Sequence, residues 1–290
     1  HWAPVEGPGH VLEVRPGKRP RLVRYQPRDY WYAPPQPAPD FVAAAIEIVE
    51  TETPEAVQGA VRANVGRTAF VGGATEEAAA FGVAADAVNP KALVARLDWE
   101  RSYKSAYEVE TLAEATVPAA RGFRAAEEAF RDGATEMEVH HTFLAAAGVM
   151  EEKLPYPTII GFDERSATLH YHGKRGTWAA PGRTMLVDAG VSVRGYGSDI
   201  TRTYTGAGCD PVFADLVSGM EALQKELAAA PRPGMKYLDL HVRAHVLIGD
   251  LLHRAGVLKV AGEAAVEKGL TRPFFPHGLG HFLGIQVHDV

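Results

Sequence analysis

Residues 184–205, TMLVDAGVSVRGYGSDITRTYT, contain two strand-like runs on either side of a turn that holds three glycines. An antiparallel hairpin across this turn would place Asp188 and Asp199 on neighbouring strands, with their side chains facing the same way. Two carboxylates placed in this way repel each other and resist joint ionisation unless a cation holds them. Each aspartate taken alone is equally well explained as a cap for a turn next to glycine. Histidines elsewhere in the chain favour the interpretation that the two aspartates together bind a cation.

Three histidines occur in HGLGHFLGIQVHDV, residues 277–290. His277 and His281 are separated by Gly-Leu-Gly, and His288 follows seven residues after His281. Glycines let the backbone approach a ligand closely, and a neutral imidazole is a good metal ligand. The spacing resembles part of the HExxH zinc motif, but the helix and the intervening glutamate of that motif are missing. The histidine spacing alone is therefore weak evidence for a metal site.

A further histidine lies in ATLHYH, residues 167–172. The alternation of polar and apolar residues predicts a strand, with Thr168, His170 and His172 on one face. A single histidine on a strand is more often a surface or hydrogen-bonded residue than a catalytic one. For His172 we keep that interpretation.

The composition is typical of a globular protein with one large domain or two ordinary ones: 290 residues, 46% apolar and 23% charged. A formal net charge of −6 gives no reason to expect a nucleic-acid partner. No apolar run approaches the roughly 18 residues of a membrane span, so we expect no membrane association. The single cysteine, Cys209, excludes an internal disulfide, and a reducing cytoplasm is the simplest location.

The patterning predicts a small α/β domain over residues 1–100 and an α+β domain over 101–290. The first domain is expected to contain strands within 11–25 and over 45–51, a helix over 54–64, a strand over 67–73 and helices over 76–82 and 91–101. In the second, the sequence indicates helices over 105–131 (interrupted at Pro118) and 135–147, strands over 158–162, 167–172, 184–190 and 198–205, and helices over 211–230 and 237–255.

The runs LVDAG, SDITRT, LHYH and PHGLGHFLGIQVHDV resemble the pita-bread metallopeptidases and, within them, bacterial Xaa-Pro dipeptidases (prolidases). The runs RYQPRDYWY, RAAEEAFRDG and LPYPTII are also similar to that family, so the resemblance covers nearly the whole chain. It implies an α+β pita-bread catalytic domain, incomplete at its C-terminus, after a smaller α/β domain whose start is missing.

The resemblance implies a site with two divalent metal ions and a bridging hydroxide. Asp188 would bind one ion, Asp199 would bridge both, and His281 would supply the imidazole ligand. Two further glutamate ligands are expected beyond Val290, so we expect the chain as written to be a truncated, incompetent form of the enzyme. A set of ligands rich in carboxylates favours Mn²⁺, although Co²⁺ and Zn²⁺ also fit.

The same resemblance assigns His170 and His288 to contacts with the substrate and the developing oxyanion. It makes Tyr156 a residue of the substrate pocket and His277 a nearby supporting residue. The implied activity is hydrolysis of Xaa-Pro dipeptides, with organophosphate ester hydrolysis known among relatives, and a homodimer is expected. An enzyme like aminopeptidase P, acting on longer peptides, and a binding module without catalysis are the alternatives.

Overall fold

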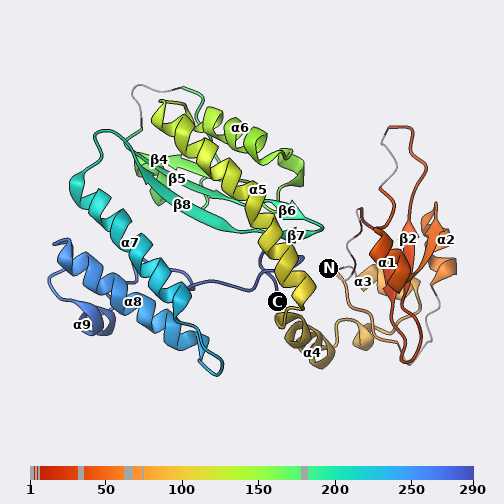
Figure 1. The fold of residues 1–290 in the computed structure, drawn as a ribbon. Helices are drawn as coiled ribbons and strands as arrows, with labels where there is room; N and C mark the ends of the chain where they lie inside the picture. The colour runs from red at the N-terminus through yellow and green to blue at the C-terminus, as the bar shows by residue number, and fades with distance from the viewer. Residues whose placement is uncertain are drawn as a thin grey trace. The chain divides into compact units, whose positions relative to one another are not determined.

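The chain forms two compact units in the computed structural model, His1–Ser105 together with Val290, and Ala106–Asp289 (Figure 1). Among the described residues, none of the helices combines the length and apolar character needed to cross a bilayer. The structure describes residues 3, 5, 7–31, 36–61, 68–73, 75–177 and 182–290.

The first unit is built on a three-stranded sheet in the order β1–β2–β3. The strands predicted within residues 11–25 are confirmed as β1 and β2, which pair antiparallel; β3 then pairs parallel with β2. The strand predicted over 67–73 is wrong for its described residues, 68–73, where Phe70 forms only an isolated bridge with Val88. The helix predicted over 54–64 is α2, and residues 62–64 of that prediction lie outside the described residues. The elements are β1 (Val11–Glu13), β2 (Arg21–Tyr25), α1 (Asp40–Ala45), β3 (Glu47–Thr51), α2 (Pro54–Ala60), α3 (Thr75–Ala80), the 3-10 helix η1 (Ala85–Ala87) and α4 (Lys91–Ser102).

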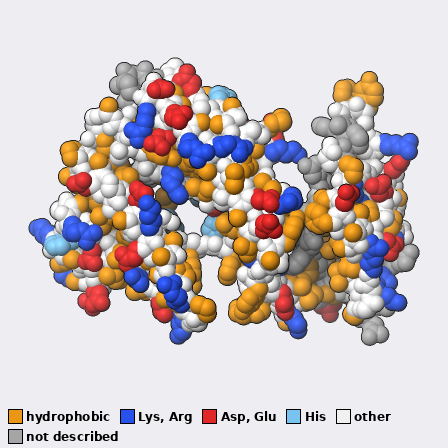
Figure 2. Space-filling view, in the orientation of Figure 1, with side chains coloured by type: hydrophobic (Ala, Val, Ile, Leu, Met, Phe, Trp, Pro, Cys, Tyr) orange, Lys and Arg blue, Asp and Glu red, His pale blue; other side chains and the backbone are white. Residues whose placement is uncertain are grey.

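The second unit begins with two helices, α5 (Ala106–Arg131) and α6 (Glu136–Ala147), which cover one face of an antiparallel sheet (Figure 1). The sheet order is β4–β5–β8, and its inward side chains form one core with those of the two helices. Basic and acidic side chains are interspersed over the outer face of these helices (Figure 2), which is typical of a solvated surface. The strands are β4 (Ile159–Phe162), β5 (Thr184–Ala189) and β8 (Ile200–Thr205).

Local signals explain where α6 begins and ends. The Thr135 side chain accepts from the backbone N–H of Glu138, and the Glu138 side chain accepts from the backbone N–H of Thr135, so a capping box starts the helix. Gly148 ends it in the left-handed conformation, with a φ of 73°. Helix α5 runs through Pro118 rather than breaking there. Burial of its inner face outweighs the one backbone bond that proline removes.

The contact between α5 and α6 depends on Gly122. A Cβ atom at this position would lie 2.6 Å from the ring of Phe143, which is fully buried. Phe143 in turn meets Phe123 edge-on, with ring centroids 5.6 Å apart. The absence of a side chain at Gly122 therefore lets the aromatic ring of α6 lie directly against the backbone of α5.

A second core joins α7 (Pro211–Ala229) and α8 (Tyr237–Arg254), with α9 (Gly262–Glu267) against α8 (Figure 1). Phe275 and Leu279 pack against this core. They flank the start of residues 277–290, which we call the histidine segment. The helices thus anchor the segment that carries His281 and His288.

The strand predicted over residues 167–172 is wrong. After β4 the chain turns at Asp163, whose φ is 51°, and forms the 3-10 helix η3 (Asp163–Ala167). Residues 168–170 are a bend and a turn. The alternation of polar and apolar side chains is compatible with a strand, but a strand forms only where a neighbouring strand pairs with its backbone N–H and C=O groups. Within the described residues no strand pairs with this stretch.

We predict that Gly122→Ala destabilises the protein. Overpacking typically lowers the free energy of unfolding by about 1–3 kcal/mol. The higher helix propensity of alanine raises it by roughly 1 kcal/mol, so the net loss is smaller than the overpacking cost. Denaturant unfolding of the Gly122→Ala, Phe143→Leu and double variants measures the effect. The double variant should lose less stability than the sum of the single variants, because the smaller leucine makes room for the new methyl group. A midpoint for Gly122→Ala equal to or above the wild-type value would show that this contact is not tight.

Candidate metal centre

Strand pairing brings Asp188 and Asp199 together. Strand β5 carries Asp188 near its end, and β8 begins one residue after Asp199. The predicted hairpin is confirmed: the strands are antiparallel, with Asp188 opposite Thr201. Asp199 precedes Thr201 by two residues, so the two-residue period of a strand puts both carboxylates on the same face. The connection between them includes the short strands β6 (Ser192–Val193) and β7 (Tyr196–Gly197).

The hairpin is tight at Gly190. A Cβ atom there would lie 1.9 Å from the carbonyl oxygen of Ser198, so only glycine fits. The backbone N–H of Ser198 donates to the carbonyl of Val191 at 3.0 Å, and the Val191 N–H donates to the Ser198 hydroxyl at 3.0 Å. These bonds fix the strand ends from which the two aspartates project.

Tyr156 links the two carboxylates. Its hydroxyl donates to Asp199 Oδ1 at 2.9 Å, and it also lies within hydrogen-bonding reach of Asp188. Burial and the two neighbouring negative charges raise the pKa of the Tyr156 phenol far above its usual value. Tyr156 therefore stays protonated and acts as a hydrogen-bond donor to the site.

Asp188 is held in an environment that disfavours its charge. Burial raises the pKa of the Asp188 carboxyl, and the negative charge of Asp199 adds a smaller increase. Hydrogen bonds from Tyr156 and Thr201 and the charge of His170 lower this pKa, but the net shift is upward. Asp188 Oδ1 is buried and has no hydrogen-bond partner within the described residues. A buried carboxylate oxygen without a donor costs roughly 1–3 kcal/mol or more.

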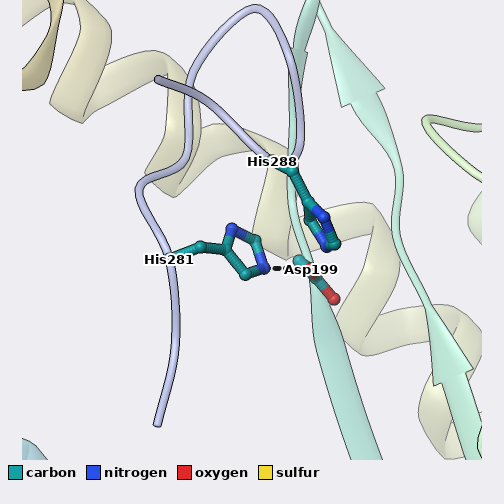
Figure 3. A group of neighbouring side chains, drawn as sticks. All are labelled: Asp199, His281 and His288. Atoms are coloured by element: carbon teal, nitrogen blue, oxygen red, sulfur yellow. Dashed lines mark hydrogen bonds and ion pairs between the residues drawn. The ribbon is translucent and has the colours of Figure 1, made fainter. Parts of the chain in front are cut away.

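Each ring nitrogen of His281 faces an acceptor. Its Nε2 lies 3.1 Å from Asp199 Oδ2 (Figure 3), and its Nδ1 lies 2.9 Å from the carbonyl oxygen of Phe282. A carbonyl and a carboxylate oxygen only accept, and a neutral imidazole has a single N–H, so it can satisfy only one of the two contacts. The other contact then sets two acceptors against each other. Only a second proton on His281 or a cation makes this arrangement favourable.

His288 lies beside His281, because the histidine segment folds back on itself. Phe282 and Asp289 form an isolated antiparallel bridge, which brings the two flanking histidines together. The ring centroids of His281 and His288 are 4.1 Å apart. Figure 3 shows both imidazoles beside Asp199, and one ligand atom from each of the three residues lies within 4.8 Å of the others.

The donor set fits a divalent metal ion. The structure groups the carboxylate of Asp199 with two imidazoles from the histidine segment, and the hairpin places Asp188 on the neighbouring strand. It leaves one carboxylate oxygen of Asp188 unpaired and sets both ring nitrogens of His281 against acceptors. Oxygen and imidazole ligands in this mixture suit Mn²⁺, Co²⁺ or Zn²⁺. Within the described residues, the possible ligands that come within 4.8 Å of one another are Asp199, His281 and His288, and Asp188 is not among them.

The other residues expected at the site are placed differently. His170 is exposed in the turn after η3, where its charge lowers the pKa of Asp188. The His277 ring lies 4.8 Å from that of Phe275, and its Nδ1 lies 2.8 Å from the carbonyl oxygen of Gly278. In this structure His277 therefore lies with the ring of Phe275, outside the group around Asp199.

Sequence reasoning missed Thr201. It lies opposite Asp188 on β8, and its hydroxyl hydrogen-bonds that carboxylate. The signal was present, because Thr201 follows Asp199 by two residues in SDITRT and therefore shares its face.

We predict that Asp188→Asn stabilises the metal-free protein at neutral pH. The folded pKa of Asp188 is raised, so its contribution to stability is complete below the unfolded pKa and is lost as pH rises through the folded pKa. The neutral amide avoids that loss. Thermal unfolding with a chelator should show a Tm higher by a few degrees, at roughly 2–4 °C per kcal/mol. The difference should shrink at acidic pH.

The matched control is Asp215→Asn, at an exposed position on α7. It should leave the Tm unchanged at both pH values. An Asp188→Asn variant with the wild-type Tm or a lower one at neutral pH would show that the buried carboxylate carries no such penalty.

Comparison with known proteins identifies sequence relatives for both units. The model of Metallopeptidase family M24 matches residues 110–290, and that of the Xaa-Pro dipeptidase N-terminal domain matches residues 1–99. A Xaa-Pro dipeptidase of Stenotrophomonas maltophilia is 39% identical over 290 residues, and one of Marinobacter nauticus is 42% identical over 292 residues. Each alignment covers 100% of this chain, and the chain spans 64% and 66% of the relatives' lengths.

Solved structures agree on the fold. Zn-substituted aminopeptidase P from E. coli, in complex with product, superimposes with a TM-score of 0.60 and 28% identity over 66% of this chain and 44% of its own. Proline aminopeptidase P II from Yersinia pestis gives a TM-score of 0.60 and 30% identity over 67% and 45% of the two chains. The expected pita-bread fold is thereby confirmed. From the family model that covers its second unit, the chain belongs to metallopeptidase family M24.

Proposed function

We propose that the protein containing this chain hydrolyses Xaa-Pro dipeptides at a centre of two divalent ions held by Asp188, Asp199 and His281. The observation that carries the proposal is the cluster of Asp199, His281 and His288, with the unpaired Asp188 oxygen beside it. The substrate class is supported by the relatives at 39–42% identity, which are named Xaa-Pro dipeptidases. When bound, such ions supply Lewis acidity and a hydroxide nucleophile at neutral pH.

The protein's own side chains would have three tasks. Tyr156, kept protonated, donates to the carboxylates and holds them in place. His288, next to His281, and His170, near Asp188, would donate hydrogen bonds to the substrate carbonyl oxygen as it gains negative charge. His277 would support this pocket from the start of the histidine segment. The peptide bond to proline has no N–H, so the pocket must select the ring itself.

Further parts of the proposal rest on the family resemblance. They are Mn²⁺ as the working metal, a homodimer, a cytoplasmic location, a side activity on organophosphate esters, and a boundary near residue 100 between the N-terminal and catalytic domains. The alternative is an enzyme like aminopeptidase P, which the solved structures favour. The match of residues 1–99 to the N-terminal domain of Xaa-Pro dipeptidases favours the dipeptidase.

We predict that the full-length protein releases proline from Xaa-Pro dipeptides, loses this activity with a chelator and regains it with Mn²⁺. Asp199→Asn should remove activity and most bound metal, because a neutral amide with one ligand oxygen would replace a carboxylate proposed to contact both ions. Elemental analysis and proline release measure both effects. Faster cleavage of tripeptides with proline second would favour the aminopeptidase. An Asn variant with two ions per chain and near-normal turnover would contradict the role of Asp199.

We predict that His288→Ala lowers kcat/KM by about 10²-fold, or ~3 kcal/mol, because a hydrogen bond to the developing oxyanion is lost. Metal content should not change, since Asp188, Asp199 and His281 are the proposed ligands. The control is His253→Ala, an exposed histidine at the end of α8, which should keep full activity. Loss of metal in the His288 variant would instead make His288 a ligand, which its closeness to Asp199 allows.

A further inference from the structure

Glu136, the first residue of α6, has no solvent exposure. Its Oε1 accepts from the backbone N–H of Phe162 at 2.9 Å and from Arg165 Nε at 2.7 Å. Its Oε2 accepts from the Tyr171 hydroxyl at 2.9 Å and from the backbone N–H of Arg175 at 2.9 Å. A carboxylate is stable away from water only when donors surround it in this way.

All four donors belong to residues 162–175, which we call the His170 segment. The backbone adds a further bond, because the N–H of Met137 donates to the carbonyl of Arg175 at 3.1 Å. The start of α6 is therefore hydrogen-bonded to both ends and to the middle of this segment. Glu136 contacts residues on either side of His170, with Arg165 before it and Tyr171 directly after it.

Besides Glu136, Asp163 also holds the His170 segment, near its start, because its Oδ1 accepts from the backbone N–H groups of Arg183 and Thr184 at 3.0 Å each. The segment follows β4 as a 3-10 helix and a turn, and within the described residues it pairs with no strand after Phe162. His170 itself is exposed, and within the same residues its ring contact is with His172, at 6.4 Å between centroids. The position of His170 is thus set by the backbone of its segment, which Asp163 holds near its start and Glu136 holds on both sides of His170.

We propose that Glu136 is a positioning residue, which holds the His170 segment so that His170 reaches the substrate carbonyl. The catalytic part of this inference rests on the role given to His170 under the proposed function. The structural alternative is that Glu136 only stabilises the start of α6. That task already belongs to Glu138, whose carboxylate accepts from the backbone N–H of Thr135 at 2.7 Å.

The test compares Glu136→Gln with Glu138→Ala in the full-length, metal-loaded protein. Glutamine keeps the shape of Glu136, but its NH₂ group must face a donor, either Arg165 or the Arg175 N–H. Glu138→Ala removes the glutamate half of the capping box and leaves the bonds between Glu136 and the His170 segment in place. Hydrogen exchange of the 162–175 amides measures how firmly Glu136 holds the segment, independently of catalysis. Proline release and elemental analysis report turnover and metal content.

For Glu136→Gln we expect exchange in the His170 segment to rise about tenfold. We also expect kcat to fall about tenfold, with KM and metal content within about twofold of wild type. Glu138→Ala should lower the Tm without either change. In a His170→Ala background, Glu136→Gln should add no further loss in kcat, because it acts through the missing side chain. Tyr171→Phe, which removes one of the four bonds, should give smaller shifts in the same directions if Glu136→Gln does not fold.

Unchanged exchange in both Glu136→Gln and Tyr171→Phe would show that Glu136 does not hold the His170 segment. Faster exchange with wild-type kcat, or a full additional loss in the His170→Ala background, would overturn the positioning role. Wild-type turnover of His170→Ala alone would contradict the proposed role of His170 and the catalytic part of this inference. The exchange result would still decide whether Glu136 holds the segment.

Discussion

The pairing of β5 with β8 is the constraint on which the candidate metal centre depends. It sets Asp188 opposite Thr201 and puts Asp199 on the same face, before any histidine is in place. The close approach at Gly190 makes this arrangement rigid, because the strands meet where the carboxylates project. Every other member attaches to this pair: Tyr156 donates to it, and His281 contacts Asp199 through Nε2.

An excess of acceptors over donors characterises the site. Within the described residues one oxygen of Asp188 is buried without a donor, and both ring nitrogens of His281 face acceptors. The fold therefore brings several hydrogen-bond acceptors together without enough donors, which lowers the free energy of unfolding of the metal-free chain. A divalent cation that binds this arrangement and not the unfolded chain would stabilise the fold by mass action. Metal affinity and folding stability are linked through the same few atoms.

Local sequence signals predicted much of this fold. The capping box at Thr135 and the alternation in TMLVDAG and SDITRTYT were enough for α6, β5 and β8. The strand predicted over 167–172 failed because pairing is not a local property. Spacing also could not reveal that His277 lies against Phe275 while His281 and His288 meet. The four bonds to Glu136 had no sequence signal, since its donors lie 26 to 39 residues away. The catalytic and ligand roles of the grouped residues stay predictions.

The contact between Asp199 and His281 joins residues 82 positions apart in the chain. During synthesis the hairpin with its two carboxylates leaves the ribosome well before the histidine segment does. The core of α7 and α8 that packs against Phe275 and Leu279 is also made after the hairpin. The group of Asp199, His281 and His288 can therefore assemble only after the chain has been synthesised through residue 288.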